Sequence, residues 1–310
     1  MGQSLIASIP DIPGLLDKGE LPNGEMAIVE DVPSAWCHIV YSILLRYSQD
    51  DNHQKKPFTL TLSGGPTAQK CYEALAASTL LPDPPPSPPV SLPSSSSTFS
   101  SSLSLSTSSP SPSAAPPSSV SPPSPPSPSP SASSVSPDPS SPPKNISWKN
   151  VNILVGDERC VPINHPDSNS GMIKTVLVDR LNDLGAFYPM DCQRGPSEYS
   201  NIISRYIPLD LVHLGMGADG HSASLFPGSA VLNEESSLVG YSRDPQQLNA
   251  HDRMTLLLPA INSSKQVIFT VSGSEKLEAM TKAMQGIDIP ALRVRATNVL
   301  WIVDEEANPR

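Results

Sequence analysis

Four apolar runs in this sequence end abruptly at short polar motifs, and this pattern limits the possible folds more than any other feature. The runs cover residues 58–62, 151–155, 209–214 and 267–271, and each is short and rich in Val, Leu or Ile. Such runs are typical of buried strands. The motifs that follow are SGG (63–65), DER (157–159), GADGH (217–221) and SGSEK (272–276).

Segments of helical character separate these strands. Residues 34–48 carry apolar side chains at helical spacing, 67–80 favour a helix by composition, and further helices are expected near 169–181 and 275–286. A last strand is expected at 299–303. Strands that alternate with helices predict an α/β fold with a mostly parallel, doubly wound sheet. Ligands of such sheets bind beyond the carboxyl ends of the strands, where the four motifs stand.

A serine- and proline-rich stretch interrupts this pattern. It holds 21 of the 37 prolines between Pro82 and Pro143, with almost no charge and a single aromatic residue, Phe99. Such a segment cannot bury enough apolar surface to offset the entropy of ordering it. We therefore expect an N-terminal tail (1–24), one folded domain in two parts (25–81 and 146–310), and a disordered insertion between them (82–145).

Charge and cysteine content narrow the partners and the compartment. The net charge of −10 and the pI near 5.0 argue against a nucleic-acid surface, which requires a basic face. No run approaches the length of a membrane span, and the N-terminus lacks a signal-peptide pattern. Cys37, Cys71, Cys160 and Cys192 lack C-x-x-C spacing, and no H-x-x-x-H motif suggests a metal. We expect a cytoplasmic protein with four reduced thiols and no metal.

The loop at 215–221 invites two interpretations. Gly215, Gly217 and Gly220 fit the dinucleotide pattern G-x-G-x-x-G, but the loop lies late in the chain and Pro227 limits any following helix. Alternatively, the glycines display Asp219 and His221 at a strand end. A histidine oriented by a carboxylate suits a general base, so His221 is the leading catalytic candidate. An ordinary surface or packing role for this histidine stays open, and His213, inside the apolar run, is expected to be structural.

Three further motifs are candidate anion sites. The Ser63-Gly64-Gly65 turn precedes a helix, whose N-terminal N–H groups attract anions, although an ordinary turn is an equal alternative. Lys276 adds a cation beside a second glycine turn. Arg159 can hold a carboxylate or phosphate through two N–H donors, unless DER is a structural ion-pair cluster. The absence of a G-x-S-x-G elbow disfavours a serine nucleophile.

Five blocks of the chain resemble 6-phosphogluconolactonases in order and style. They are LSGGPTAQKCYEAL, WKNVNILVGDERCVPINHPDSNSGM, LDLVHLGMGADGHSASLFPGS, RMTLLLPAINSSKQVIFTVSGSEKLEAM and VLWIVDEEA. The resemblance implies a single-domain Rossmann-like fold and hydrolysis of 6-phospho-D-glucono-1,5-lactone without metal or organic cofactor.

The resemblance also implies roles for single residues. His221, with Asp219 beside it, activates water, while Arg159 and Lys276 hold charged groups of the substrate. Ser63, Gly64 and Gly65 line the phosphate pocket, and Arg253 is a further anion contact. The sequence departs from the usual SGGSTP at SGGPTA, where Pro66 removes a hydroxyl and an N–H donor.

Two other functions stay open. Amino-sugar-phosphate isomerase/deaminases also carry a G-x-D-G-H loop, but typically continue into an acidic FNEP-type segment, where this chain has SLFPGS. A non-catalytic sugar-phosphate-binding protein is the second alternative, motivated by Pro66 and the insertion. The stretch SPPSPPSPSP makes the insertion a candidate ligand for proline-recognition domains.

Overall fold

The computed structural model of the chain describes residues 12–49, 56–80 and 146–309. The predicted insertion (82–145) and the first eleven residues of the predicted tail lie outside the described residues. Everything described belongs to one compact unit.

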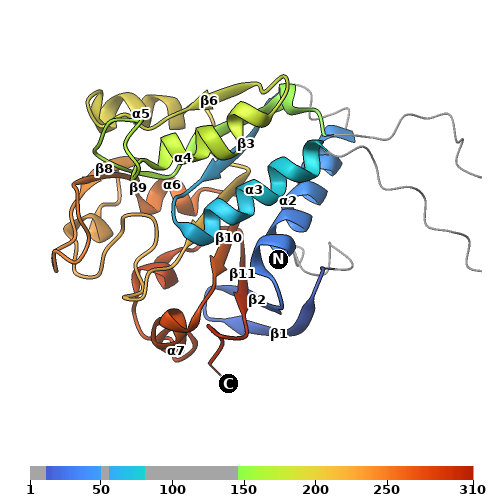
Figure 1. Cartoon of the computed structure of the whole chain (residues 1–310). Helices are drawn as coiled ribbons and strands as arrows, with labels where there is room; N and C mark the ends of the chain where they lie inside the picture. Colours follow the sequence, from blue (N-terminus) through green and yellow to red (C-terminus); the bar gives the residue numbers. More distant parts are fainter. Residues whose placement is uncertain (1–11, 50–55, 81–145, 310) are drawn as a thin grey trace, which may run out of the picture. The chain divides into compact units, whose positions relative to one another are not determined.

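The main sheet has eight strands in the order β1-β2-β11-β10-β7-β3-β4-β6 (Figure 1). The strands are β1 (Leu15–Leu21), β2 (Gly24–Val29), β3 (Phe58–Leu62), β4 (Val151–Val155), β6 (Ala186–Tyr188), β7 (Leu211–Gly215), β10 (Gln266–Val271) and β11 (Asn298–Asp304). All neighbours pair in parallel except β1 and β2, which form an antiparallel hairpin. The predicted doubly wound, mostly parallel sheet is confirmed.

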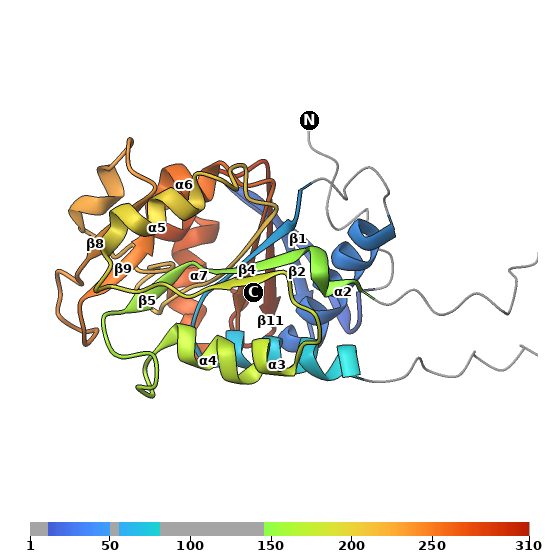
Figure 2. The ribbon, with the colours of Figure 1, turned by 90° about the horizontal axis from the view of Figure 1, so that it is seen from above.

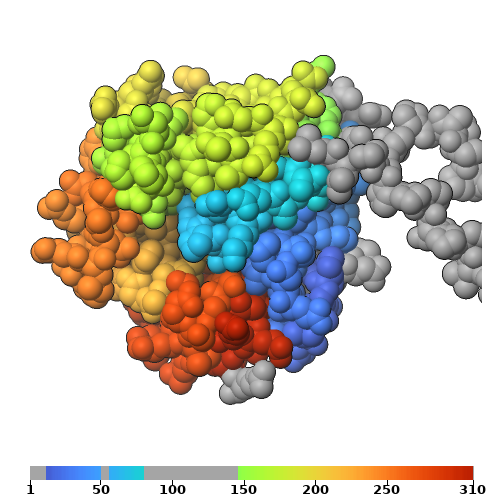
Figure 3. Space-filling view, in the orientation of Figure 1, coloured from blue at the N-terminus to red at the C-terminus, as the bar shows by residue number. Residues whose placement is uncertain are grey.

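Helices cover both faces of this sheet. The helices are α2 (Val32–Gln49), α3 (Pro66–Leu80), α4 (Asn169–Val176), α5 (Gly195–Ile203), α6 (Leu258–Asn262) and α7 (Leu277–Met284). Figure 2 shows α3 and α4 along one face, with α5 and α6 on the other. Helix α3 packs between α2 and α4, and these helices lie side by side on the surface in Figure 3. None of the helices in the described ranges is long and apolar enough to cross a bilayer.

A second, three-stranded antiparallel sheet stands beside the main one. Its order is β5-β9-β8, from β5 (Asp157–Arg159), β9 (Arg253–Leu256) and β8 (Val239–Ser242). The DER motif is therefore not only the end of a parallel strand, as its position after 151–155 suggested. It forms β5 itself, and the register places Arg159 directly opposite Arg253.

The largest correction to the predicted elements is at the N-terminus. Residues 15–21 were expected to belong to a polar tail, but they form β1 at the edge of the main sheet. The run LLDKGEL has charged side chains and exposed positions, so it lacks the apolar pattern of a buried strand. An edge strand with one neighbour needs little burial, and Lys18 and Glu20 suit it because charges discourage pairing with other chains.

His213 lies in the core, as predicted for a structural histidine. Its Nδ1 is 3.0 Å from the Tyr72 hydroxyl, its Nε2 is 2.9 Å from the Thr270 hydroxyl, and its ring packs at a tilt against Trp36 with centroids 4.6 Å apart. Burial disfavours the charged imidazolium and lowers the pKa of His213 to about 3. The ring is therefore neutral at physiological pH.

This burial predicts a pH dependence of stability. An unfolded histidine binds a proton below a pH of about 6.5, whereas folded His213 does so only near pH 3. Between these values the unfolded state binds the extra proton, so the free energy of unfolding should fall by up to about 1.4 kcal/mol per pH unit as pH decreases. Urea titrations from pH 7 to 4 should show a shallower fall for His213→Gln. Equal slopes for the wild type and His213→Gln would contradict the assignment.

Candidate active site

The candidate active site lies at the point of the main sheet where the strand order reverses. The chain passes from β3 to β4 and β6 on one side, then returns through β7 to β10 and β11 on the other, so β3 and β7 are neighbours whose following loops diverge. Such a switch point is the usual ligand site of a doubly wound sheet. A cavity of about 210 Å³ opens there. Its lining includes all the predicted site residues except Asp219: Ser63, Gly64, Gly65, Arg159, His221, Arg253 and Lys276.

His221 and Asp219 form a pair in the loop after β7. His221 Nδ1 lies 2.5 Å from Asp219 Oδ1, and the backbone N–H of His221 donates to the same oxygen at 3.1 Å. Burial alone would raise the pKa of Asp219, but the bonds from His221 and its nearby ring outweigh this and lower that pKa. An ionised Asp219 accepts a hydrogen bond from the Nδ1–H of His221. The lone pair of the neutral imidazole is then on Nε2.

The glycines of this loop allow the imidazole its position. Gly217 N donates to His221 O at 2.8 Å, and Gly220, at a φ of +84°, donates back to Gly217 O at 3.0 Å. A Cβ at position 217 would collide with the His221 ring. The G-x-G-x-x-G spacing therefore reflects a tight turn that displays the His–Asp pair.

The SGG turn opens α3 against the cavity. The first helical bond runs from Gln69 N to Gly65 O at 2.9 Å, so the N–H groups of Thr67 and Ala68 precede the hydrogen-bonded turn. Gly64 packs so closely on the Asn169 side chain that a Cβ there would overlap it. Pro66 is the first residue of α3, a position where proline is well tolerated. Its missing N–H leaves one donor fewer at this helix end.

Arg159 and Arg253 face the same cavity from paired strands. Arg159 Nη1 donates to Asp167 O at 2.6 Å, and Arg253 Nη2 donates to Ala250 O at 3.2 Å. The buried Nε atoms of both arginines lack a hydrogen-bond partner among the described residues. Burial, and then the charge of Arg159, lower the pKa of Arg253. Two adjacent cations with unused donors form a natural receptor for an anion.

The acidic residues of the DER motif have a different role from Arg159. The Glu158 carboxylate accepts from Asn169 N at 2.7 Å, Ser170 N at 2.7 Å and Ser168 Oγ at 3.0 Å, so it caps α4. Asp157 accepts from Ser224 Oγ at 2.8 Å. No ion pair joins the acids of this motif to Arg159 in the part of the chain that the structure describes, and Asp157 lines the cavity together with Arg159.

Lys276 reaches the cavity from the loop after β10. Its Nζ lies 3.8 Å from Glu275 Oε1, and its side chain is 22% exposed. Asp304, at the end of β11, fixes the preceding turn by accepting from Ser272 Oγ at 2.5 Å and from Gly273 N at 2.9 Å. Sequence reasoning missed Asp304, because its role depends on β10 and β11 being neighbours.

Asn249 was also missed, and it lines the cavity from the loop between β8 and β9. Buried Asp244 organises this loop by accepting from Gln246 N, Leu248 N and Asn249 N within 3.0 Å. The only signal in the sequence is an aspartate that precedes several polar residues, which is common in surface loops.

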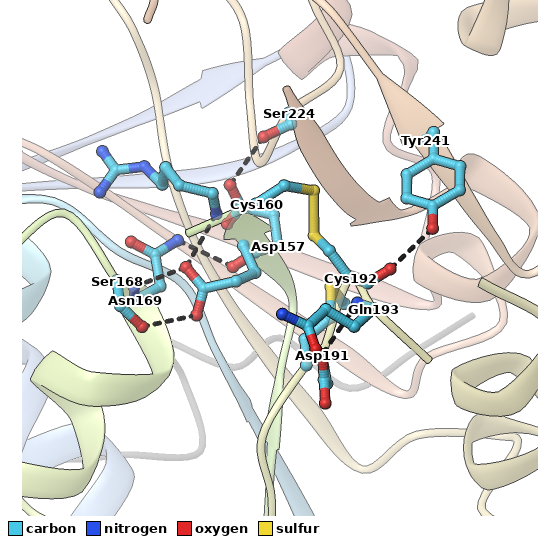
Figure 4. Close-up of a disulfide and its surroundings, with 12 residues drawn as sticks. Asp157, Cys160, Ser168, Asn169, Asp191, Cys192, Gln193, Ser224 and Tyr241 are labelled. Carbon is cyan, nitrogen blue, oxygen red and sulfur yellow. Dashed lines mark hydrogen bonds between the residues drawn. A yellow bond between two sulfur atoms is a disulfide. The ribbon is translucent and has the colours of Figure 1, made fainter. Parts of the chain in front are cut away.

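Two cysteines next to this site correct a prediction. Cys160 and Cys192 form a disulfide, shown in Figure 4, whereas all four cysteines were expected to be reduced thiols. Cys37 and Cys71 are free and buried. The 32-residue separation of the bonded pair gave no recognisable spacing, since the two meet only through the packing of β5 beside the loop before α5. In the described ranges, no three His, Cys, Asp or Glu side chains are placed to share a metal ion.

The fold and this site define a Rossmann-like α/β protein with a His–Asp pair and three basic side chains around one cavity at the carboxyl ends of its strands. Residues 127–301 match the family described as glucosamine-6-phosphate isomerases/6-phosphogluconolactonase, so the chain belongs to that family. A 6-phosphogluconolactonase of Mycobacterium leprae is 33% identical over 186 residues, covering 53% of this chain and 74% of the relative. 6-Phosphogluconolactonase 3 of Saccharomyces cerevisiae is 32% identical over 182 residues, covering 52% and 72%.

Solved structures share the fold at lower identity. The 6-phosphogluconolactonase of Trypanosoma brucei aligns with a TM-score of 0.60 at 18% identity, covering 93% of this chain and 98% of that one. A monomeric glucosamine-6-phosphate deaminase aligns with a TM-score of 0.57 at 15% identity, covering 91% and 98%. These likenesses bear out the Rossmann-like fold, which both branches of the family share.

Proposed function

We propose that this protein hydrolyses 6-phospho-D-glucono-1,5-lactone to 6-phospho-D-gluconate, a step of the oxidative pentose phosphate pathway. The observation that carries the proposal is the convergence on one cavity of His221, oriented by Asp219, with three cations, Arg159, Arg253 and Lys276. The relatives named 6-phosphogluconolactonase support the same reaction.

In the proposed mechanism His221 is the general base. Its Nε2 takes a proton from water as the water oxygen bonds to the lactone carbonyl carbon, and the carbonyl becomes an oxyanion. The intermediate then collapses, the bond from that carbon to the ring oxygen breaks, and the imidazolium returns its proton to the ring oxygen. Asp219 stabilises the imidazolium between these steps through the 2.5 Å contact to Nδ1.

The cations have the task of orientation in this proposal. Arg159, Arg253 and Lys276 hold the phosphate and other charged oxygens of the substrate, with the Ser63-Gly64-Gly65 turn and the start of α3 lining the phosphate side. Fixing a remote phosphate places the lactone carbonyl against the activated water, which lowers the entropic part of the barrier. This chemistry needs no metal or organic cofactor.

The isomerase/deaminase reaction is the alternative within the family, and the SLFPGS segment after His221 disfavours it because it supplies no carboxylate. The two are separated by incubating purified protein with fresh 6-phosphogluconolactone and, in parallel, with glucosamine-6-phosphate. We expect rapid acid release from the lactone above its spontaneous hydrolysis, and no ammonia from the amino sugar. Ammonia release would favour the alternative, and turnover of neither substrate would favour a binding protein.

The proposal also covers location and partners. We place the reaction in the cytoplasm and propose a sugar-phosphate lactone as the small-molecule partner of the folded domain, with no nucleic acid or membrane bound. For residues 82–145 the composition, with repeats such as SPPSPPSPSP, supports binding to proline-recognition domains.

A further inference from the structure

We propose that the Cys160–Cys192 disulfide is a positioning element for the paired arginines, and that its reduction by a dithiol weakens anion binding in the cavity. The proposal rests on the proposed function only where turnover is measured. Cys160 directly follows Arg159, and its backbone N–H donates to Asp252 O at 2.8 Å. Asp252 directly precedes Arg253. Each arginine therefore lies one residue from the point where Cys160 joins the two strands.

The other end of the disulfide is fixed to the same small sheet. Cys192 O accepts from the Tyr241 hydroxyl at 2.7 Å, as Figure 4 shows, and Tyr241 lies on β8, opposite Met254 of β9. The disulfide thus joins the end of β5 to a loop that is itself held to the β8–β9 hairpin.

The backbone pairing beside the arginines is short. Strand β5 has three residues, pairs only with β9 and stands at the edge of the small sheet. Arg159 and Arg253 face each other in the register, and like charges placed directly opposite destabilise a strand pair. A covalent link next to Arg159 restrains β5 against this repulsion, so that both guanidinium groups stay close enough to contact one anion.

The disulfide is accessible to a reductant, and the other two cysteines are free thiols below the surface. Cys160 and Cys192 are half-buried, whereas Cys37 and Cys71 are buried and burial raises the pKa of both thiols. A dithiol thiolate attacks one sulfur, and the S–S bond breaks as a mixed disulfide forms. The second thiol of the reagent then closes its own disulfide, so two electrons and two protons pass to Cys160 and Cys192. In reducing compartments, disulfides that do form are usually transient or redox-sensing.

The test compares oxidised and dithiothreitol-reduced full-length protein, with thiol counting to verify complete reduction. Inorganic phosphate binding is measured by calorimetry, and KM and kcat are measured with the lactone. We expect reduction to raise both the phosphate Kd and the KM for the lactone about 10-fold, which corresponds to the loss of roughly one charge-assisted hydrogen bond. The kcat should change less than about two-fold. Reoxidation should restore both values.

Variants make the assignment specific. The double variant Cys160→Ser/Cys192→Ser should show the reduced-state values with or without dithiothreitol, whereas Cys37→Ser should respond like wild type. Tyr241→Phe keeps the disulfide and should raise the phosphate Kd about two-fold. This variant provides a second test if the double variant does not fold. An unchanged phosphate Kd on complete reduction, or a fall in kcat alone, would overturn the proposal. If oxidised protein binds phosphate but hydrolyses no lactone, the proposed function fails while the phosphate comparison still decides this inference.

Discussion

His221→Ala is expected to reduce kcat for lactone hydrolysis by about 10²- to 10⁴-fold, the usual contribution of a positioned general base. KM should change little, since the imidazole acts on the attacking water and the cations hold the substrate. The measurement is acid release from fresh 6-phosphogluconolactone, corrected for spontaneous hydrolysis. Asp219→Asn should give a smaller loss, because the imidazole keeps a neighbour but loses the charge that stabilises its protonated form.

The control for this experiment is His38→Gln, which replaces a half-buried histidine on α2. It should leave kcat at the wild-type value. If His221→Ala retained full activity while folded, the base would have to be another group, and the roles given to His221 and Asp219 would both be wrong.

Arg253→Met is expected to raise KM about 10- to 100-fold with a much smaller change in kcat. A charge-assisted hydrogen bond to a buried ligand is worth about 1.5–3 kcal/mol, and each 1.4 kcal/mol is a factor of ten in affinity. Methionine keeps much of the apolar volume of the side chain against Phe226, whose ring centroid lies 6.0 Å from the guanidinium carbon. The loss should therefore report on charge rather than on packing.

Arg243→Met is the matched control, since Arg243 lies close by in the chain with a side chain that is 76% exposed and paired with Asp252. Its KM should match that of the wild type, because an exposed ion pair contributes little. Similar effects of the two substitutions would show that general surface charge, and not a specific contact at Arg253, governs substrate affinity.

The main sheet could be predicted from sequence because its central strands are buried on both faces. The run at 58–62 is buried throughout, and the predicted bounds of this strand match β3. The same reasoning failed at β1, whose polar composition fits an edge strand as well as a tail. It also missed β8, where Gly240 and the exposed Tyr241 give no apolar run.

The candidate site was predictable where one motif holds its own geometry. Asp219 and His221 are two residues apart and bond within one turn, so their pairing depends on nothing distant. The arginine pair depends on a register between β5 and β9, nearly a hundred residues apart in the chain, which no local pattern encodes. The same holds for the disulfide and for Asp304, whose partners are neighbours only in the folded protein.

The division of the site between two sheets has a consequence for the size of ligand that it accepts. The imidazole extends from the loop after β7 of the main sheet, whereas both guanidinium groups extend from the small sheet. Two hydrogen bonds of 2.8 Å connect these parts, one from Ser224 Oγ to Asp157 and one from Leu256 N to Gly156 O. The separation between the imidazole and the two guanidinium groups is thus set by how the two sheets are docked. Ser224→Ala, which removes the bond to Asp157, is therefore expected to change the relative KM values for phosphosugar lactones of different length, measured as acid release.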